Sequence, residues 1–577
     1  MSRTWYAPNP DRLENQLSGI QKDPRLKLFT KDGNDLMGLL ESRVTPPDQR
    51  PAEPNASMTE AGKNAGLDQA LASCRLWAEK LENNGRGICL VLVLIVATDQ
   101  IVKAFLRPFW FDELFTYYLA RFDMSIMVAA VARGEISNTL VGHGLTRLSS
   151  SLFGATEFGT RFPSVVAFLL AVVFLYRFVA GRYGVSCGLS SALWLCLTGA
   201  YYYGSEARSY AVVLACASIA LWLWARASTS GRRSIHVILL GATLAVAIAS
   251  HLYAALLLIP FWVGETVRLY ERRKMDWPLV CALVLPVGSL TLHLPSMLFL
   301  SDVKGGFYSP VSWTSVAEYL IMAYLEAAPL LILACVVSLY MGRQERRIFE
   351  PQGPPVLGYS RPEWAALVTL AFLPLIAVVL GSLYTNAFVP RYVLSSIVGF
   401  SALVPAVLET RLRGTSSWRP ILVFLFLLGF LGIRVIPAVR AVLQYESPEA
   451  LIEKYLPLEA MGNGADPVVV ASPLLFPVFA QYGPPQLQKR LVYIVDPKAA
   501  VQFTGRNTPD LSLLSVVPWS DLRIQSYESF MSQHEKFFVI YAYGDEFQWL
   551  TSKLQADGKA VSLVTQKGKY TLSQCCR

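Results

Sequence analysis

Long apolar runs recur along the chain between residues 87 and 440, and short polar loops separate them. A helix needs about 20 apolar residues to cross a membrane, and several of the runs approach that length. The pattern therefore predicts about eleven membrane-spanning helices. Their expected positions are 87–106, 162–180, 185–203, 210–225, 235–250, 252–267, 278–300, 316–341, 363–384, 391–409 and 420–440.

Three other segments surround or interrupt this region of predicted spans. Residues 1–86 are polar and contain proline clusters, so we expect a largely disordered region with one short amphipathic helix near 67–81. Residues 107–161 form a long loop after the first span. In residues 441–577 the apolar runs are short, β-branched or aromatic, and separated by turn residues, which is typical of a small α/β domain.

Composition agrees with a polytopic α-helical membrane protein, because 53% of the residues are hydrophobic and only 16% are charged. Lysine and arginine gather in alternate loops, which predicts a cytoplasmic amino terminus and an extracytoplasmic carboxyl-terminal domain. The net charge of +9 follows from these loops, so it does not imply a nucleic-acid partner. No cysteine and histidine spacing suits zinc. A bacterial inner membrane is the expected location.

Polar residues that could take part in catalysis or binding gather at the span ends on the side away from the amino terminus. They are Asp112 and Glu113; His143; Glu206, Arg208 and Tyr210; His251 and Tyr253; and Arg391 and Tyr392. The planar guanidinium of arginine suits phosphate, and an ionised carboxylate can accept a proton from a hydroxyl. The set predicts a site for a lipid whose tail stays in the bilayer while its phosphate-linked head reacts.

Four stretches give this chain a resemblance to a known family. They are FDELFT in the first long loop, GHGLTRLSSSLFGATEFGTRFPSVVAFLL leading into the second span, SEARSYAVVLA after the third, and PRYVLSS late in the chain. Together they resemble the C-type membrane glycosyltransferases, in the branch of protein O-mannosyltransferases and lipid A aminoarabinose transferases. The resemblance covers about residues 88–440.

The resemblance implies a polyprenyl-phosphate-linked sugar as donor and an acceptor hydroxyl on a lipid, a glycan or a protein. Asp112 would be the general base, and Glu113 would position the acceptor or hold Asp112. Arg208 and Arg391, with Tyr210 and Tyr392 beside them, would hold the donor phosphate, and the anomeric carbon would invert. The remaining candidates for acceptor or sugar contact are His143, His251, Tyr253 and Glu206. The family often has two prolines after the position of His143, where this chain has glycine and leucine.

Several alternatives stay open at this stage. A divalent metal ion held by His143, His251 and a carboxylate is one, since imidazole and carboxylate suit several such ions. Asp112 and Glu113 also fit a solvated helix start, and the two arginines fit structural pairs. A transporter or flippase of lipid-linked sugars, or a membrane scaffold, would use the same spans. Asp99 and Lys103 inside the first span have the spacing of an ion pair.

Overall fold

The computed structural model describes residues 56–132, 139–228, 232–295, 297–298, 309–348, 358–462 and 464–576. Most of the predicted disordered region therefore lies outside the described residues. The chain divides into two compact units, Met1–Ser73 and Cys74–Arg577. The predicted amphipathic helix and the first span belong to one element, the α-helix α2 (Ala56–Leu106).

Helices make up the described chain from α2 to residue 443. They are α3 (Phe111–Leu119), α4 (Met124–Ala132), α5 (Leu140–Phe153), α6 (Glu157–Tyr183), α7 (Val185–Leu197), η1 (Gly199–Ser205), α8 (Tyr210–Ala227), α9 (Arg233–Ser250), η2 (Leu252–Leu257), α10 (Leu258–Arg272), α11 (Trp277–Val284), η3 (Leu285–His293), α13 (Thr314–Tyr324), α14 (Ala328–Ile348), α15 (Arg361–Ala371), α16 (Leu373–Leu380), η4 (Gly381–Thr385), η5 (Pro390–Val393), α17 (Ser396–Arg411), α18 (Trp418–Phe430), η6 (Leu431–Val435) and α19 (Ile436–Leu443).

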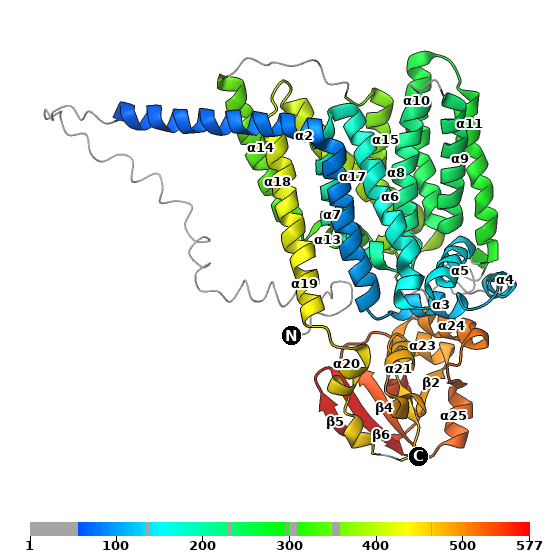
Figure 1. Ribbon diagram of the computed structural model, residues 1–577. Helices are drawn as coiled ribbons and strands as arrows, with labels where there is room; N and C mark the ends of the chain where they lie inside the picture. The colour runs from blue at the N-terminus through cyan, green and yellow to red at the C-terminus, as the bar shows by residue number, and fades with distance from the viewer. Residues whose placement is uncertain are drawn as a thin grey trace, which may run out of the picture. The chain divides into compact units, whose positions relative to one another are not determined.

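Six helices within the described ranges are long and apolar enough to cross a membrane, and the number is eight if two bent helix pairs each form one span. The bent pairs are α13 with α14 and α15 with the helix that follows it, at 71° and 56°. The chain is thus a multi-pass membrane protein of mostly helical structure (Figure 1). Ten of the predicted positions overlap these helices, the bent pairs or shorter apolar helices, and the position 391–409 falls on η5 and α17. The count of eleven stays a prediction.

A buried polar group inside the first span confirms the predicted ion pair. Lys103 Nζ lies 2.6 Å from Asp99 Oδ2, and the Tyr201 hydroxyl donates to the same oxygen at 2.5 Å. Lys103 Nζ also lies 4.6 Å from the centre of the Tyr201 ring. Charged groups in a span need such partners, so these contacts join α2 to η1.

The carboxyl-terminal segment forms a six-stranded sheet with helices, which confirms the predicted small α/β domain. Its elements are α20 (Pro448–Tyr455), η7 (Leu458–Met461), β1 (Val468–Val470), α21 (Phe476–Tyr482), α22 (Pro485–Gln488), β2 (Leu491–Val495), α23 (Pro497–Thr504), α24 (Thr508–Val516), η8 (Val517–Trp519), β3 (Ile524–Ser526), α25 (Tyr527–Gln533), β4 (Lys536–Ala542), α26 (Leu550–Ala556), β5 (Ala560–Lys567) and β6 (Tyr570–Cys576).

The order of strands in this sheet is β3-β2-β1-β4-β6-β5. The first four strands are parallel, and β6 runs antiparallel to both β4 and β5. All residues of β1 and β2 are buried, as expected for parallel strands covered on both faces. Strand β3 was not predicted because only one of its residues, Ile524, is apolar, and β6 was not predicted because polar residues interrupt its apolar ones.

One apolar cluster joins the first long loop of the bundle to this α/β domain. Phe111, Leu114 and Phe115 of α3 are buried in the same cluster as Phe476 and Phe479 of α21. Figure 1 shows α3 at the end of the bundle next to the sheet domain. Burial of several aromatic side chains stabilises a contact by a few kcal/mol per residue, so α3 depends on the domain for part of its core.

Tyr482 at the end of α21 adds two hydrogen bonds across this contact. Its hydroxyl accepts from the backbone N–H of Phe109 at 2.8 Å and donates to Glu157 Oε1 at 2.9 Å. Phe109 lies two residues before α3, and Glu157 is the first residue of α6. The tyrosine therefore holds the loop, the second long helix and the domain together.

We predict that Tyr482→Phe destabilises the contact by about 1–3 kcal/mol, because the buried N–H of Phe109 loses its acceptor. Chemical denaturation of the purified protein in detergent measures the change in the free energy of unfolding. Tyr541→Phe is the matched control, since the structure gives the Tyr541 hydroxyl no hydrogen bond within the described ranges. Equal stability of the two variants would contradict the prediction.

Candidate active site

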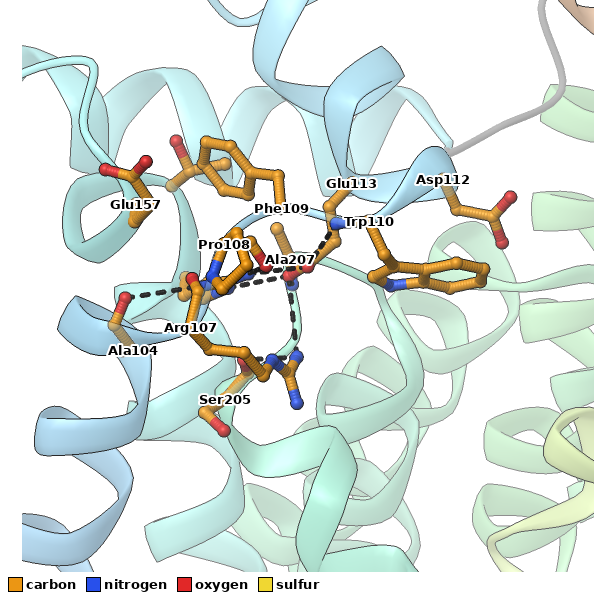
Figure 2. Close-up of polar contacts among 12 residues, drawn as sticks. Ala104, Arg107, Pro108, Phe109, Trp110, Asp112, Glu113, Glu157, Ser205 and Ala207 are labelled. Atoms are coloured by element: carbon orange, nitrogen blue, oxygen red, sulfur yellow. Dashed lines mark hydrogen bonds and ion pairs between the residues drawn. The ribbon is translucent and has the colours of Figure 1, made fainter. Parts of the chain in front are cut away.

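The first turn of α3 directs the two acidic residues to different places. Trp110 is the residue before the helix, and its backbone N–H donates to Glu113 Oε2 at 3.4 Å, which closes a capping arrangement. Successive helical residues point about 100° apart, so Asp112 and Glu113 cannot face the same way. In Figure 2, Glu113 points toward Arg107 and Ala207, whereas Asp112 points away beside Trp110.

Glu113 is fully buried and forms a two-pronged ion pair with Arg161 of α6. Arg161 Nε donates to Glu113 Oε1 at 2.7 Å, and Arg161 Nη2 donates to Oε2 at 2.6 Å. The backbone N–H of Ala207 donates to Oε1 at 2.7 Å. Burial by itself would raise the pKa of Glu113, but the charge and hydrogen bonds of Arg161 outweigh it and lower the pKa.

Arg161 also closes the end of α2. Its guanidinium donates to the carbonyl oxygens of Ala104 at 3.2 Å and Pro108 at 2.9 Å, and to that of Arg107. Last-turn carbonyls of a helix have no partner within the helix, so this arginine caps α2 while it pairs with α3. Arg107 Nη2 donates to the Ser205 carbonyl at 3.0 Å, which joins the end of η1 to this group.

Asp112 faces two arginines from distant parts of the chain. Its Oδ2 accepts from Arg391 Nη2 at 3.1 Å and lies 3.7 Å from Arg208 Nη2. All three side chains keep some exposure, 16% for Asp112, 21% for Arg391 and 12% for Arg208. Buried Arg208 Nη1 has no hydrogen-bond partner within the described residues. The arrangement leaves a donor available for a further anion.

Aromatic side chains line the arginine pair. Arg391 Nε donates to the Tyr210 hydroxyl at 2.9 Å, and the Arg391 guanidinium lies 5.5 Å from the centre of the Trp110 ring. The ring centre of Tyr392 lies 4.9 Å from those of His251 and Tyr253. Such contacts fix guanidinium groups and rings in one orientation. The structure thus brings together seven predicted residues: Asp112, Arg208, Tyr210, His251, Tyr253, Arg391 and Tyr392.

His251 has a neutral imidazole in this setting. Burial lowers its pKa to about 3, and the positive charges of Arg208, His293 and Arg391 act in the same direction. Its Nδ1 accepts from the backbone N–H of Tyr253 at 3.2 Å. This histidine therefore cannot act as a cation near neutral pH.

Glu206 lies in the loop between η1 and α8, two residues before Arg208. It is 7% exposed, and burial together with the charge of Glu113 raises its pKa to about 7, although Arg107, Arg391 and Arg208 lower it. Its Oε1 is buried without a hydrogen-bond partner among the described residues. A carboxyl group whose pKa lies near neutrality can hold or release a proton within the site.

His143 is fully buried in α5. Within the described part of the chain, no three histidine, cysteine, aspartate or glutamate side chains stand close enough to hold a metal ion. Among these described residues, His143 and His251 therefore have no completed ligand set. The roles predicted for these two histidines toward sugar or acceptor stay predictions.

Comparison with known proteins supports a glycosyltransferase class. Residues 137–295 match a family model described as dolichyl-phosphate-mannose-protein mannosyltransferase. This match confirms the resemblance seen in the sequence motifs for this part of the chain, and it indicates a glycosyltransferase. No curated protein sequence matches the chain significantly.

Three solved structures illustrate what the chain is similar to. ArnT from Cupriavidus metallidurans in the apo state has 13% sequence identity and a TM-score of 0.47, over 84% of this chain and 97% of that one. The same protein bound to undecaprenyl phosphate has 13% sequence identity and a TM-score of 0.46, over 84% of this chain and 97% of that one. An Archaeoglobus fulgidus oligosaccharyltransferase in the apo form has 11% sequence identity and a TM-score of 0.43, over 79% of this chain and 69% of that one.

Sequence reasoning did not single out Arg161, Trp110 or Tyr482. One feature of the sequence pointed to Arg161. It is one of the arginines of the first long loop, and the orientation rule disfavours arginines on that side of the membrane. Trp110 had no such signal, because aromatic residues are common where a span meets the membrane surface, and nothing in the sequence distinguishes Tyr482 from the other tyrosines of its domain. Their partners lie 3 to 373 residues away.

We predict that Glu113→Gln destabilises the protein by about 3–5 kcal/mol, because Arg161 is left as a buried charge without its counter-charge. Thermal unfolding in detergent measures the effect. Glu318→Gln on the exposed face of α13 is the control and is expected to change stability by less than about 0.5 kcal/mol. A stable Glu113→Gln protein would show that the ion pair does not organise α3.

We predict that Glu206→Gln flattens the pH dependence of stability. The folded pKa of Glu206 is raised from 4.5 to about 7, so the folded state holds the proton more tightly and wild-type stability falls as pH rises through this window. The loss amounts to roughly 3 kcal/mol. Unfolding at pH 5 and pH 8 measures it. An identical pH response in wild type and Glu206→Gln would contradict the raised pKa.

Proposed function

We propose that this protein is a membrane glycosyltransferase that moves a sugar from a polyprenyl-phosphate carrier to an acceptor hydroxyl at the membrane face where Asp112 lies. The observation that carries the proposal is the carboxylate of Asp112 between two arginines, Arg208 and Arg391, at one end of the bundle. The family match to enzymes that use a dolichyl-phosphate-linked sugar supports the donor class.

The two arginines would bind the phosphate of the donor. Each guanidinium has five N–H donors, and arginine and phosphate can form two parallel hydrogen bonds. Without donor, Asp112 is the anion that both arginines face. A donor phosphate would compete with Asp112 for these groups and leave its carboxylate available to the acceptor. The phosphate leaves as an anion, so the reaction needs no general acid.

Asp112 would then act as the base. Its carboxylate takes the proton of the acceptor hydroxyl, the hydroxyl oxygen forms a bond to the anomeric carbon, and the bond from that carbon to the phosphate oxygen breaks. The electron pair leaves with the polyprenyl phosphate, whose charge Arg208 and Arg391 stabilise. Attack from the face opposite the leaving group inverts the anomeric carbon. Glu113, turned away and paired with Arg161, would hold the helix that carries Asp112.

The positions of basic residues at the helix ends indicate how the protein is oriented in the membrane. Exposed arginines of α6 and α8, Arg177 and Arg226, lie at the helix ends opposite Glu157 and Tyr210, which are on the Asp112 side. The orientation rule would place these arginines, and the amino terminus, in the cytoplasm. The active site and the α/β domain would then be extracytoplasmic, and a bacterial inner membrane fits this arrangement.

We predict that Asp112→Asn keeps the fold but lowers transfer by about 10²–10⁴-fold, because the amide cannot accept the acceptor proton. The assay is sugar transfer in proteoliposomes from labelled polyprenyl-phosphate sugars to membrane acceptors. Asp123→Asn is the matched control, since Asp123 is an exposed carboxylate in the same loop. Full transfer by Asp112→Asn would rule out its role as base.

The same proteoliposomes separate the proposal from a transporter of lipid-linked sugars. A glycosyltransferase forms a new covalent product, whereas a flippase moves the labelled donor across the bilayer unchanged. Crosslinking with a short polyprenyl monophosphate tests the donor site without knowledge of the sugar. Arg208→Gln and Arg391→Gln should each weaken this crosslink.

A further inference from the structure

A basic cavity lies at the ends of α6 and α8 away from the candidate active site, beside the middle of α2. Arg86 of α2, Arg177 of α6 and Arg226 of α8 line it, and its volume is about 680 Å³. Arg177 lies 16 residues along α6 from Arg161, which corresponds to roughly 24 Å of helix. The cavity is thus separate from the site around Asp112.

Two of the arginines that line this cavity lie beside one aromatic ring. The guanidinium carbons of Arg177 and Arg226 lie 5.3 Å and 5.7 Å from the centre of the Trp222 ring. No carboxylate within the described residues pairs with Arg86, Arg177 or Arg226. Three positive charges that line one cavity without a paired carboxylate favour a bound anion.

The rest of the cavity wall is apolar and borders the lipid-facing surface of the first span. Leu90 and Val93 of α2 and Val173 of α6 line it, and Leu90 is 59% exposed. A ligand there meets hydrocarbon on one side and guanidinium groups on the other. Snorkelling arginines alone would account for the charge, but they would not require two guanidiniums on one tryptophan above an apolar wall.

We propose that this cavity binds the phosphate headgroup of an anionic phospholipid, with an acyl chain lying along α2 beside Leu90. Guanidinium groups suit phosphate, and basic pockets between membrane helices bind anionic headgroups. The volume falls within the usual range for small-molecule sites. The proposal rests on membrane insertion of the helices, and it is independent of the glycosyltransferase reaction.

Native mass spectrometry of the full-length, delipidated protein tests the site with two probes, phosphatidylglycerol and phosphatidylcholine. The wild type is expected to retain phosphatidylglycerol in preference to phosphatidylcholine. In the double variant Arg177→Gln/Arg226→Gln, binding of phosphatidylglycerol should be roughly 30-fold weaker, since two basic contacts are lost. If this variant does not fold, Arg226→Gln alone should weaken binding roughly fivefold.

Arg343→Gln/Arg347→Gln is the matched control, because both arginines are exposed at the end of α14 and do not line the cavity. It should bind phosphatidylglycerol like the wild type. Equal weakening in both double variants would show a general effect of surface charge and overturn the proposal. Equal binding of phosphatidylcholine, or complete displacement of phosphatidylglycerol by inorganic phosphate alone, would also overturn it.

Discussion

The buried ion pair between Glu113 and Arg161 is the interaction on which the candidate site depends. Arg161 caps the end of α2 and pairs with the first turn of α3, while Glu113 also accepts from the loop before α8. A charge of this kind is tolerated in the interior only when every donor and acceptor is satisfied. Because Glu113 points inward, its neighbour Asp112 points outward to Arg208 and Arg391.

The two adjacent acids, Asp112 and Glu113, have different roles because their side chains point in different directions. One residue along a helix changes the direction of a side chain by about 100°, so one acid can be structural while the next reaches the arginines. Glu206 is the third acid of the region, and its raised pKa reflects burial near Glu113 without a direct partner. Glu113, whose pKa is lowered, and Glu206, whose pKa is raised, therefore differ in how readily they hold a proton although both are buried in the same region.

Much of this arrangement could be predicted from the sequence. Apolar runs predicted the helices that are long enough to cross a membrane, and short β-branched or aromatic runs predicted four of the six strands. The predicted topology placed Asp112, Arg208 and Arg391 at span ends on the same side, and the isolation of the two arginines there predicted that each binds an anion. Arg161 and Tyr482 could not be assigned in this way, because their roles depend on contacts with residues far away in sequence.

The apolar cluster shared by α3 and α21 has a consequence for how the protein is made. Phe109 and Tyr482 are 373 residues apart, and ribosomes add roughly 5–20 residues per second. Synthesis of the segment that covers the aromatic face of α3 therefore takes roughly 20–75 s after α3 itself has been made. During synthesis that face is open to other proteins or to the membrane surface. A chain that stops before the α/β domain keeps all the arginines of the site but lacks the core that sets the helix bearing Asp112.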